Sequence, residues 1–158
     1  MAWNPRVSVV ESARAFRASR DGVGLWPALR RKAARLRHRF WSVVTGSDIV
    51  LGASLGERLS LPHPTGVVIH QDAVVGDDCM IMQQVTIGQL AGPGVPVLGA
   101  RVYVGAGAKI LGPVRIGDGA RIGANAVVLT DVPPDHTAVG IPAVARPRAT
   151  GEDSQAAA

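Results

Sequence analysis

The stretch LGARVYVGAGAKILGPVRIGDGARIGANAVV, residues 98–128, repeats one pattern every six residues. A large aliphatic side chain returns at each sixth position, at Leu98, Val104, Ile110, Ile116, Ile122 and Val128. Four residues after each of these comes a second apolar position, which is small in most repeats. A fixed short period of this kind is typical of a solenoid, in which each repeat stacks on its neighbours, and not of a sandwich.

The same period runs back through the chain to residue 49. The earlier large aliphatic positions are Ile49, Leu55, Leu61, Ile69, Val75, Ile81 and Ile87, and the second inward positions there are Ala53, Leu59, Thr65, Ala73, Cys79 and Val85. Short strands joined by corners wind into a triangular coil with three hexads per turn, here roughly four coils. Glycine follows the aliphatic in most repeats, as we expect where a corner demands backbone angles that glycine adopts readily. The sequence therefore predicts a mainly β fold, a parallel β-helix, with Cys79 as a small apolar interior residue.

Two insertions break the six-residue count. Ile69 follows Leu61 after eight residues, and Leu98 follows Ile87 after eleven. The first insertion holds the segment PHPTG, and the second holds the Gly/Pro-rich segment GQLAGPGVPV. Because departures from a strict local rule concentrate where function was fitted in, we expect the first to present a reactive group and the second to cover it.

His63 is the titratable residue of the first insertion. It follows Leu61 by two residues, which is an outward position, and a proline flanks it on each side. One interpretation is a surface corner residue; the other is a general base, since a neutral imidazole takes up a proton near working pH. Asp48 precedes His63 by fifteen residues, close to one coil of eighteen, so the spacing allows an acid–base pair on adjacent coils.

The first 47 residues follow a helical pattern. Val10, Ala13 and Phe16 indicate one short helix, and a second apolar series with steps of three and four predicts an amphipathic helix. This second stripe, which we expect to be core, consists of Trp26, Leu29, Ala33, Leu36, Phe40 and Val43. The opposite face carries Arg30, Arg31, Lys32, Arg35 and Arg39. A basic face is usually solvated; the alternatives are a docking surface for an acidic partner and a surface that binds a membrane or a nucleic acid.

Composition limits the class of protein. The 158 residues carry a formal charge of +5 and one cysteine, which suits one globular domain without a disulfide framework. No stretch has the pattern of a signal peptide or the length of a membrane span, so we expect a cytoplasmic protein with neither a membrane nor a nucleic-acid partner. We divide the chain into a helical segment at 1–47, a β-helix at 48–148 and a disordered tail at 149–158.

The segments from Asp48 to about Arg148 carry a family resemblance. In order they are SDIVLGASLGERLSLPHPTGVVI, AVVGDDCMIMQQVTIG, VGAGAKILGPVRIGDGARIGANAVVL and VPPDHTAVGIPA. Together they resemble the catalytic domain of the serine O-acetyltransferases, a branch of the hexapeptide-repeat acyltransferases. The resemblance implies a left-handed β-helix, acetyl-CoA as co-substrate, no metal, and a homotrimer with active sites between its subunits.

The resemblance also implies roles for individual residues. His63 matches the family's general base and Asp48 its acidic partner, so His63 deprotonates the acceptor, which attacks the acetyl-CoA thioester without an acyl-enzyme. The positions that match CoA contacts are Thr86, Gly105, Ala106, Gly123 and Ala124. Arg146 and Arg148 fall near the family's basic tail, where they either meet CoA phosphates or are ordinary solvated arginines.

The chain departs from that pattern in three ways. Pro62 stands where the family has Asp before its base, and the loop at residues 89–96 lacks the arginine and histidine that help to hold the carboxylate of serine. Only a short helical region precedes the array, where the family usually has a larger domain that pairs trimers. The acceptor therefore stays open between serine, a sugar hydroxyl as in exopolysaccharide acetyltransferases, and an amino-acid-like acceptor on an acidic carrier protein.

Two other function classes compete with the acetyltransferase. A metal-dependent hydratase on a similar prism needs three converging histidines. Besides His63, the chain offers His38 in the basic helix, His70 at a corner and His136 in a turn. Because these lie in different kinds of segment, we do not expect a three-histidine metal site. The second class is a catalytically inactive scaffold, against which the pairing of His63 with Asp48 argues.

Overall fold

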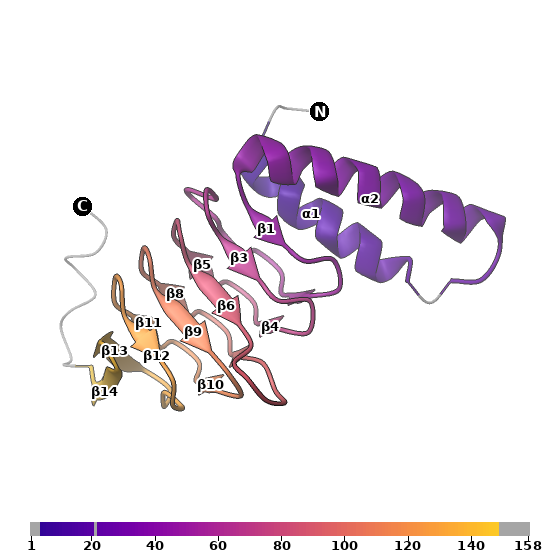
Figure 1. The fold of residues 1–158 in the computed structure, drawn as a ribbon. Coiled ribbons are helices and arrows are strands. Elements are labelled where there is room, and N and C mark those ends of the chain that lie inside the picture. Colours follow the sequence, from indigo (N-terminus) through magenta and orange to yellow (C-terminus); the bar gives the residue numbers. More distant parts are fainter. Residues whose placement is uncertain (1–3, 21, 149–158) are drawn as a thin grey trace.

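The computed structural model describes residues 4–20 and 22–148, which form two helices followed by a β-helix (Figure 1). The tail at 149–158, interpreted above as disordered, lies outside the described residues. Within the described part of the chain, no helix is long and apolar enough to cross a membrane.

Three sheets form the faces of a triangular prism. Their strand orders are β1-β3-β6-β9-β12, β2-β4-β7-β10 and β5-β8-β11-β13-β14, and every pair is parallel except the antiparallel hairpin of β13 and β14. This is the left-handed parallel β-helix that the family resemblance implies. The strands are β1 (Asp48–Ile49), β2 (Ser54–Leu55), β3 (Val68–Ile69), β4 (Val74–Val75), β5 (Met80–Ile81), β6 (Thr86–Gly88), β7 (Val97–Leu98), β8 (Tyr103–Val104), β9 (Lys109–Leu111), β10 (Arg115–Ile116), β11 (Arg121–Ile122), β12 (Val127–Val128), β13 (His136–Gly140) and β14 (Ala143–Pro147).

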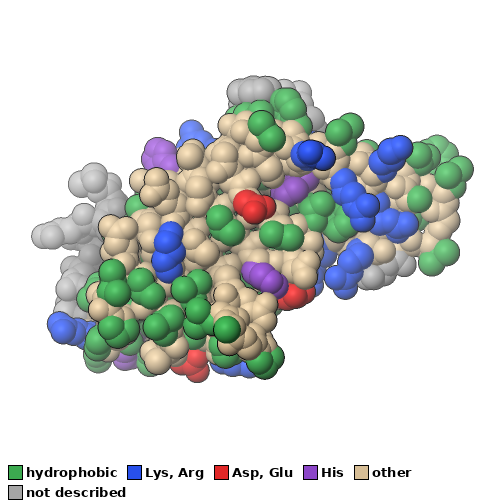
Figure 2. Space-filling model, in the orientation of Figure 1, with side chains coloured by type: hydrophobic (Ala, Val, Ile, Leu, Met, Phe, Trp, Pro, Cys, Tyr) green, Lys and Arg blue, Asp and Glu red, His purple; other side chains and the backbone are tan. Residues whose placement is uncertain are grey.

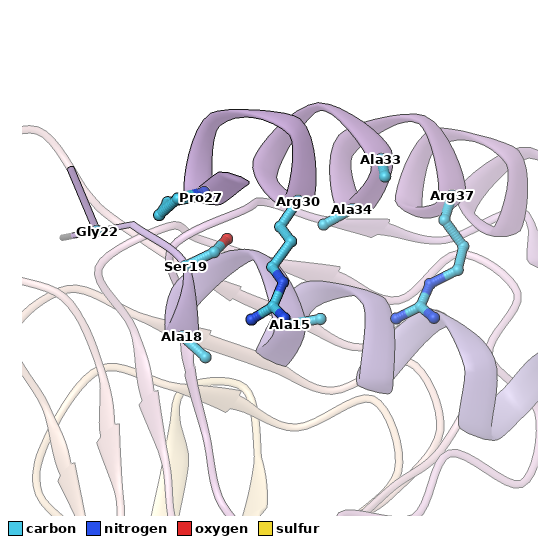
Figure 3. A pocket seen from close by; sticks show the side chains of 9 residues that line it. All are labelled: Ala15, Ala18, Ser19, Gly22, Pro27, Arg30, Ala33, Ala34 and Arg37. Carbon is cyan, nitrogen blue, oxygen red and sulfur yellow. The ribbon is translucent and has the colours of Figure 1, made fainter. Parts of the chain in front are cut away.

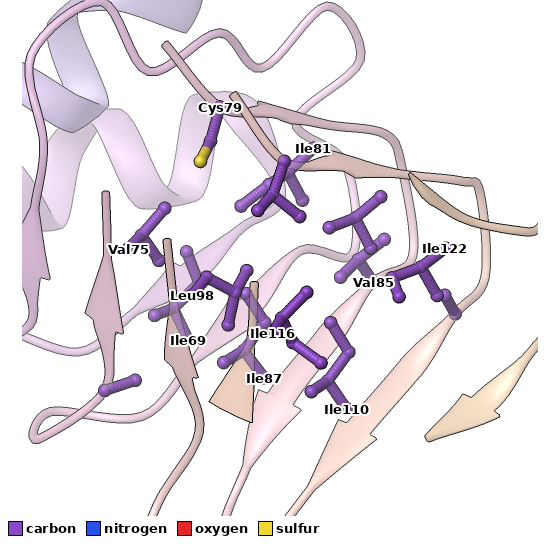
Figure 4. Close-up of a cluster of buried hydrophobic side chains, with 14 of the residues drawn as sticks. Ile69, Val75, Cys79, Ile81, Val85, Ile87, Leu98, Ile110, Ile116 and Ile122 are labelled. Carbon is purple, nitrogen blue, oxygen red and sulfur yellow. The ribbon is translucent and has the colours of Figure 1, made fainter. Parts of the chain in front are cut away.

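The interior of the prism is a stack of aliphatic side chains, as the six-residue period predicts (Figure 4). Of the large aliphatic positions named above, only Leu55 is half-buried and the others are buried. Cys79 is confirmed as an interior residue, and its burial raises the pKa of the thiol. The prediction for Thr65 is wrong: Thr65 is exposed and Val67 is buried in its place, because the extra residues of the first insertion precede Val67.

The corner glycines are required for a different reason from the predicted one. Gly76 and Gly99 are not among the residues with positive φ. Instead, a Cβ at Gly76 would lie 2.4 Å from the carbonyl oxygen of Gly99, so the next coil leaves no room for a side chain. The left-handed conformation falls two residues later, at Asp78 and Arg101, with φ of 57 and 56 degrees. Close stacking of coils, and not unusual backbone angles, therefore selects glycine at these corners.

Helix α1 (Pro5–Ala18) closes the first end of the prism, and the predicted short helix is confirmed (Figure 1). Val9, Val10 and Ala13 belong to the same hydrophobic cluster as the prism interior. Arg14 Nε donates to the carbonyl oxygen of Leu55 at 3.2 Å. The helix thus covers the apolar end of the first coil and satisfies backbone acceptors at its edge.

Helix α2 (Leu25–Thr45) packs on α1 through a different side from the predicted one. Its buried residues include Ala34 and His38, whereas Trp26 is 76% exposed and Phe40 is 52% exposed. The prediction that the aromatic stripe is core is therefore wrong for this chain. The other members of the stripe, Leu29, Ala33, Leu36 and Val43, are exposed as well.

His38 accounts for the side on which α2 packs. Its Nδ1 lies 3.0 Å from Ser12 Oγ of α1, and its Nε2 lies 2.6 Å from the carbonyl oxygen of Ile49 in β1. One buried imidazole thereby connects both helices to the first strand. Because a buried polar group must find partners, these two contacts direct this side of α2 inward.

Candidate active site

The first insertion presents His63 at one edge of the prism. The chain leaves the interior at Leu61, which is 2% exposed, and returns to it at Val67, which is fully buried. His63 lies between them and is exposed. The two extra residues are therefore accommodated outside the stack, and the imidazole faces away from the core.

Backbone hydrogen bonds hold this insertion against the coils before and after it. Gly66 N donates to the carbonyl oxygen of Gly46 at 2.7 Å, and Gln84 N donates to that of Thr65 at 2.9 Å. The prolines at 62 and 64 restrict φ on both sides of His63. The imidazole consequently projects from a backbone that is anchored at its C-terminal end.

Asp48 lies on the coil next to this insertion. It begins β1, its side chain is exposed, and its N–H donates to the carbonyl oxygen of Val67 at 2.8 Å. In the described residues, no hydrogen bond or ion pair joins Asp48 to His63. The structure thus places the two residues on adjacent coils without a direct contact, and their pairing stays a prediction.

The corner that carries His63 continues along the prism as a column of stacked segments. Gly107 N donates to the carbonyl oxygen of Gln83 at 2.9 Å, and Asn125 N donates to that of Ala106 at 2.8 Å. These bonds join successive coils at the same corner. We call this column the His63 edge, and it comprises residues 62–66, 82–84, 105–107 and 123–125.

Four of the residues assigned to CoA by resemblance lie on the His63 edge. Ala124 is exposed, Ala106 and Gly123 are half-buried, and Gly105 is buried. A Cβ at Gly105 would lie 2.7 Å from Ala124 N, so the stacking of coils alone requires glycine there. The structure thus brings these positions into line with His63, which sequence spacing did not establish.

Thr86 extends the site from the His63 edge onto the neighbouring sheet. In the ladder it pairs with Val68, which pairs in turn with Asp48. On its other side Thr86 pairs with Lys109, whose Nζ donates to the carbonyl oxygen of Gln84 at 2.6 Å. Lys109 was missed by the sequence analysis, although it is the charged residue of the quoted segment VGAGAKILGPV. Lys109 therefore places a cation at the border of the His63 edge.

Gln83 is a second residue that the sequence analysis missed. Its Oε1 is buried and accepts no hydrogen bond from any described residue. A buried acceptor without a partner costs about 1–3 kcal/mol, so an unpaired oxygen on this edge marks a place where a ligand N–H or O–H is favoured. Nothing in the sequence distinguishes this glutamine from a solvated one.

Arg146 and Arg148 lie away from the other residues assigned to CoA. Arg146 pairs with Thr137 near the beginning of β13, whereas strands of this sheet reach the His63 edge at their ends. Arg148 Nη1 donates to the carbonyl oxygen of Gly119 at 3.4 Å, and its Nη2 is 3.8 Å from Asp135 Oδ1. Within one chain these arginines do not join the site, so a role toward CoA stays a prediction.

The second insertion lies at the opposite end of the strands of this sheet from His63. It follows β6, whereas the first insertion precedes β3, and these strands are parallel neighbours. The loop at 89–96 packs on the next coil, where a Cβ at Gly112 would be 3.2 Å from Leu90 Cδ1. Its sequence, QLAGPGVP, contains no charged residue. The expectation that this loop covers His63 is therefore not met within one chain.

Several cavities of the described residues border the helices. One of about 510 Å³ opens between α1 and α2, where Arg30 and Arg37 reach over a floor that includes Ala15 and Ala18 (Figure 3). Another of about 460 Å³ lies between α1 and the first coil and reaches Pro62. His63 lines neither of these two, so the candidate site is an open edge of the prism and not an enclosed pocket.

The remaining histidines have local roles. His38 is buried between the helices, His70 Nδ1 accepts a hydrogen bond from Asp72 N at 3.2 Å, and His136 Nδ1 is 2.8 Å from the carbonyl oxygen of Pro134. Across residues 4–20 and 22–148, no three His, Cys, Asp or Glu side chains come together as metal ligands would.

Comparisons with known proteins agree with this geometry. A family model described as bacterial transferase hexapeptide (six repeats) matches residues 96–130. The serine acetyltransferase of Mycobacterium tuberculosis is 48% identical over 121 residues, which cover 75% of this chain and 53% of that protein. A serine acetyltransferase structure in complex with CoA aligns with a TM-score of 0.74 and 36% identity over 87% of this chain and 55% of that one. Soybean serine acetyltransferase complexed with serine aligns with a TM-score of 0.71 and 40% identity over 85% and 56%.

This chain spans about half the length of the relatives that it matches. The similarity covers most of this chain, including the β-helix that carries the His63 edge. The other half of each relative lies outside the comparison, so the activity of those proteins does not transfer by similarity alone.

Proposed function

We propose that this chain, which belongs to the hexapeptide-repeat transferases and is similar to their serine acetyltransferases, is an acetyl-CoA-dependent O-acetyltransferase. One observation carries the proposal: an inserted, exposed His63 lies on the same prism edge as Ala106 and Ala124, which match CoA contacts. A scaffold without chemistry has no need to interrupt its stack at a histidine.

The proposed reaction is a direct transfer. His63 takes the proton of the acceptor hydroxyl while the hydroxyl oxygen attacks the thioester carbonyl carbon of acetyl-CoA. The carbon–sulfur bond then breaks, the acetyl group stays on the acceptor oxygen, and the imidazolium returns the proton to the leaving CoA sulfur. Asp48, from the adjacent coil, orients the imidazole and stabilises its positive charge. No protein nucleophile takes part, which agrees with the burial of Cys79 and the raised pKa of its thiol.

The residues of the His63 edge suit acetyl-CoA. Ala106 and Ala124 are small, so an extended pantetheine arm approaches the backbone without steric conflict. When the half-buried side chain of Gln83 turns its unpartnered Oε1 outward, this oxygen accepts a hydrogen bond from an amide N–H of that arm, and Lys109 supplies a cation beside it. These contacts together provide the orientation that a direct transfer requires.

A homotrimer completes this site in the proposal. The His63 edge is open, and the loop at 89–96 lies at the other end of the strands of the same sheet. When copies of the prism stand side by side, the loop of one copy is carried toward the His63 edge of the next. The supporting observation is that neither segment reaches the other within one chain.

The acceptor carries a hydroxyl group, and L-serine is the first candidate. The soybean enzyme of the same fold is complexed with serine, which favours this choice. A sugar hydroxyl is the second candidate, because the loop at 89–96 offers no charge to hold an amino-acid carboxylate and Pro62 offers none beside His63. The two candidates share the same base and the same thioester chemistry.

The test is release of free thiol from acetyl-CoA, measured with L-serine, related amino acids and nucleotide sugars. We expect His63→Ala to lower kcat by about 100-fold or more with the acceptor that the wild type uses, because a general base contributes at least that factor. Circular dichroism is expected to stay unchanged, since His63 lies outside the core.

The matched control is His136→Ala, which removes an imidazole away from the His63 edge and is expected to keep the wild-type rate. Wild-type turnover by His63→Ala contradicts the assignment of the base. A folded wild-type protein that releases no thiol with any acceptor favours the inactive scaffold instead.

A further inference from the structure

Helix α2 turns an apolar stripe away from the rest of the molecule. Trp26, Leu36 and Val43 are 76%, 73% and 78% exposed, while Ala34 and His38 on the other side are buried. The stripe runs for about 28 Å along the helix axis at 1.5 Å per residue. Exposed apolar rows of this extent indicate a surface that another body covers. The full set, called the α2 stripe below, is Leu25, Trp26, Leu29, Leu36, Phe40, Val43 and Val44, with Ala33 at the border where it also lines the cavity between the helices.

Cations flank the α2 stripe on both sides. At 3.6 residues per turn, Arg30 and Arg37 follow the border of the stripe nearer α1, where they also line the cavity between the helices, and Lys32 and Arg39 follow the other border. All four are exposed, and Lys and Arg side chains gather over the helical end of the molecule in Figure 2. Helix α2 contains no acidic residue. The stripe and its borders therefore form one amphipathic surface of uniform positive charge.

The two other basic residues of α2 have partners within the chain. Arg31 Nη1 donates to the carbonyl oxygen of Ser19 at 3.1 Å and to that of Gly22 at 2.6 Å. The guanidinium carbon of Arg35 lies 5.1 Å from the centre of the Phe16 ring. These contacts hold α2 against α1, so the basic residues divide into a pair that binds the helices together and four that border the stripe.

These features favour an anionic lipid surface over a second copy of the helix. Leucine, tryptophan and phenylalanine enter the boundary between headgroups and acyl chains, while cations beside them stay level with lipid phosphates. Two stripes packed together would instead bring borders of like charge side by side, without an acidic residue on α2 to neutralise them. A flat anionic surface supplies negative charge along both borders at once.

We propose that α2 docks the protein on anionic membranes by laying the α2 stripe into the lipid interface. This inference is independent of the acetyltransferase chemistry, because the stripe faces away from the coils that carry His63. The expectation of no membrane partner was based on the lack of a membrane-spanning stretch, and a helix that lies on a membrane surface does not need one. The expectation that the stripe is core is wrong in the structure. The docking is peripheral and reversible, since one helix with four bordering cations is a modest anchor.

The test is sedimentation of the full chain with vesicles of phosphatidylcholine, alone or with about one third phosphatidylglycerol. We expect binding to the anionic vesicles only, and weaker binding as salt rises. The double variant Leu36→Glu/Phe40→Glu is expected to lower the partition coefficient by tenfold or more. Its control is Val144→Glu, which adds one glutamate at a 57% exposed valine of β14 and is expected to bind as the wild type does.

A second arm tests the borders of the stripe. Arg30→Gln/Arg39→Gln removes one cation from each side and is expected to weaken binding to anionic vesicles by about fivefold per charge. Emission from Trp26 is expected to shift to shorter wavelength with these vesicles, and Trp26→Phe is expected to remove that shift.

Three results would overturn the proposal. The first is no binding to anionic vesicles. If the chain then binds polyglutamate instead, the surface is assigned to an acidic protein. The second is unchanged binding by Leu36→Glu/Phe40→Glu. The third is a smaller assembly for that variant in lipid-free solution together with wild-type vesicle binding, which shows that another copy covers the stripe.

Discussion

The prism and helix α2 both carry a regular apolar pattern, but only the pattern of the prism is buried. Ile110, in the six-residue series, is fully buried, whereas Leu36, in the helical series, is 73% exposed. The difference follows from topology. A coil encloses its own interior, so an inward side chain is buried by the chain itself, while the apolar side of a helix needs a second body to cover it. Periodicity thus identifies the residues that share a face, and topology decides whether that face is covered.

The largest effect is expected inside the prism. Ile110→Ala removes a fully buried side chain from the middle of the stack, between Ile87 and Val128 of the neighbouring rungs. We expect a loss of about 3–4 kcal/mol in the free energy of unfolding, because the close-packed coils above and below cannot collapse into the cavity. Urea unfolding followed by circular dichroism measures this loss. A loss below about 1 kcal/mol would mean that the stack is loosely packed, and the contrast with α2 would disappear.

A smaller loss is expected at the corners. Gly76→Ala places a Cβ 2.4 Å from the carbonyl oxygen of Gly99, and the overlap is expected to lower the free energy of unfolding by about 2–3 kcal/mol. Gly88→Ala is the matched control, since the nearest atom to its added Cβ is 3.5 Å away. Neither glycine has positive φ, so backbone strain does not enter the comparison. Equal thermal unfolding curves for the two variants would refute close stacking as the reason for corner glycines.

The interior rows were predictable because each position repeats the same environment. Leu98 to Val128 establish the six-residue step, and Ile69, Val75, Ile81 and Ile87 repeat the same step before the second insertion. The side on which α2 packs was not predictable in this way. It depends on His38, whose partners Ser12 and Ile49 are distant in the chain, so no local pattern signals that a polar residue faces inward.

The residues of the candidate site also divide into those that the repeat predicts and those that it does not. His63 was found because its insertion interrupts a repeat, and the stacked segments at 105–107 and 123–125 follow from counting coils. Two residues were missed: Gln83, which matters because its buried oxygen is unpaired, and Lys109, which matters because it pairs with Thr86 in the ladder. Burial and strand register are properties of the assembled coils, and residue type at one position does not report them.

A third variant tests the contact that joins the two regions. His38→Leu keeps the volume of the side chain but removes the polar contacts to Ser12 Oγ and the carbonyl oxygen of Ile49. We expect a loss of about 1–2 kcal/mol in the free energy of unfolding, since the buried carbonyl loses a partner that water cannot replace. Arg39→Leu, at the exposed neighbouring position, is the control and is expected to have little effect. A His38→Leu protein as stable as the wild type would mean that packing alone orients α2.

The smallest effect is expected on the α2 stripe, where Leu36→Ala truncates a large apolar side chain as Ile110→Ala does. In lipid-free solution we expect a change within about 0.5 kcal/mol, because a side chain that is 73% exposed loses little burial and alanine favours the helix. Urea unfolding of both variants under one set of conditions makes the comparison direct. A loss for Leu36→Ala approaching that of Ile110→Ala would show that protein covers the stripe in solution. The two apolar patterns would then differ only in which chain buries them, and a membrane would have no free surface to engage.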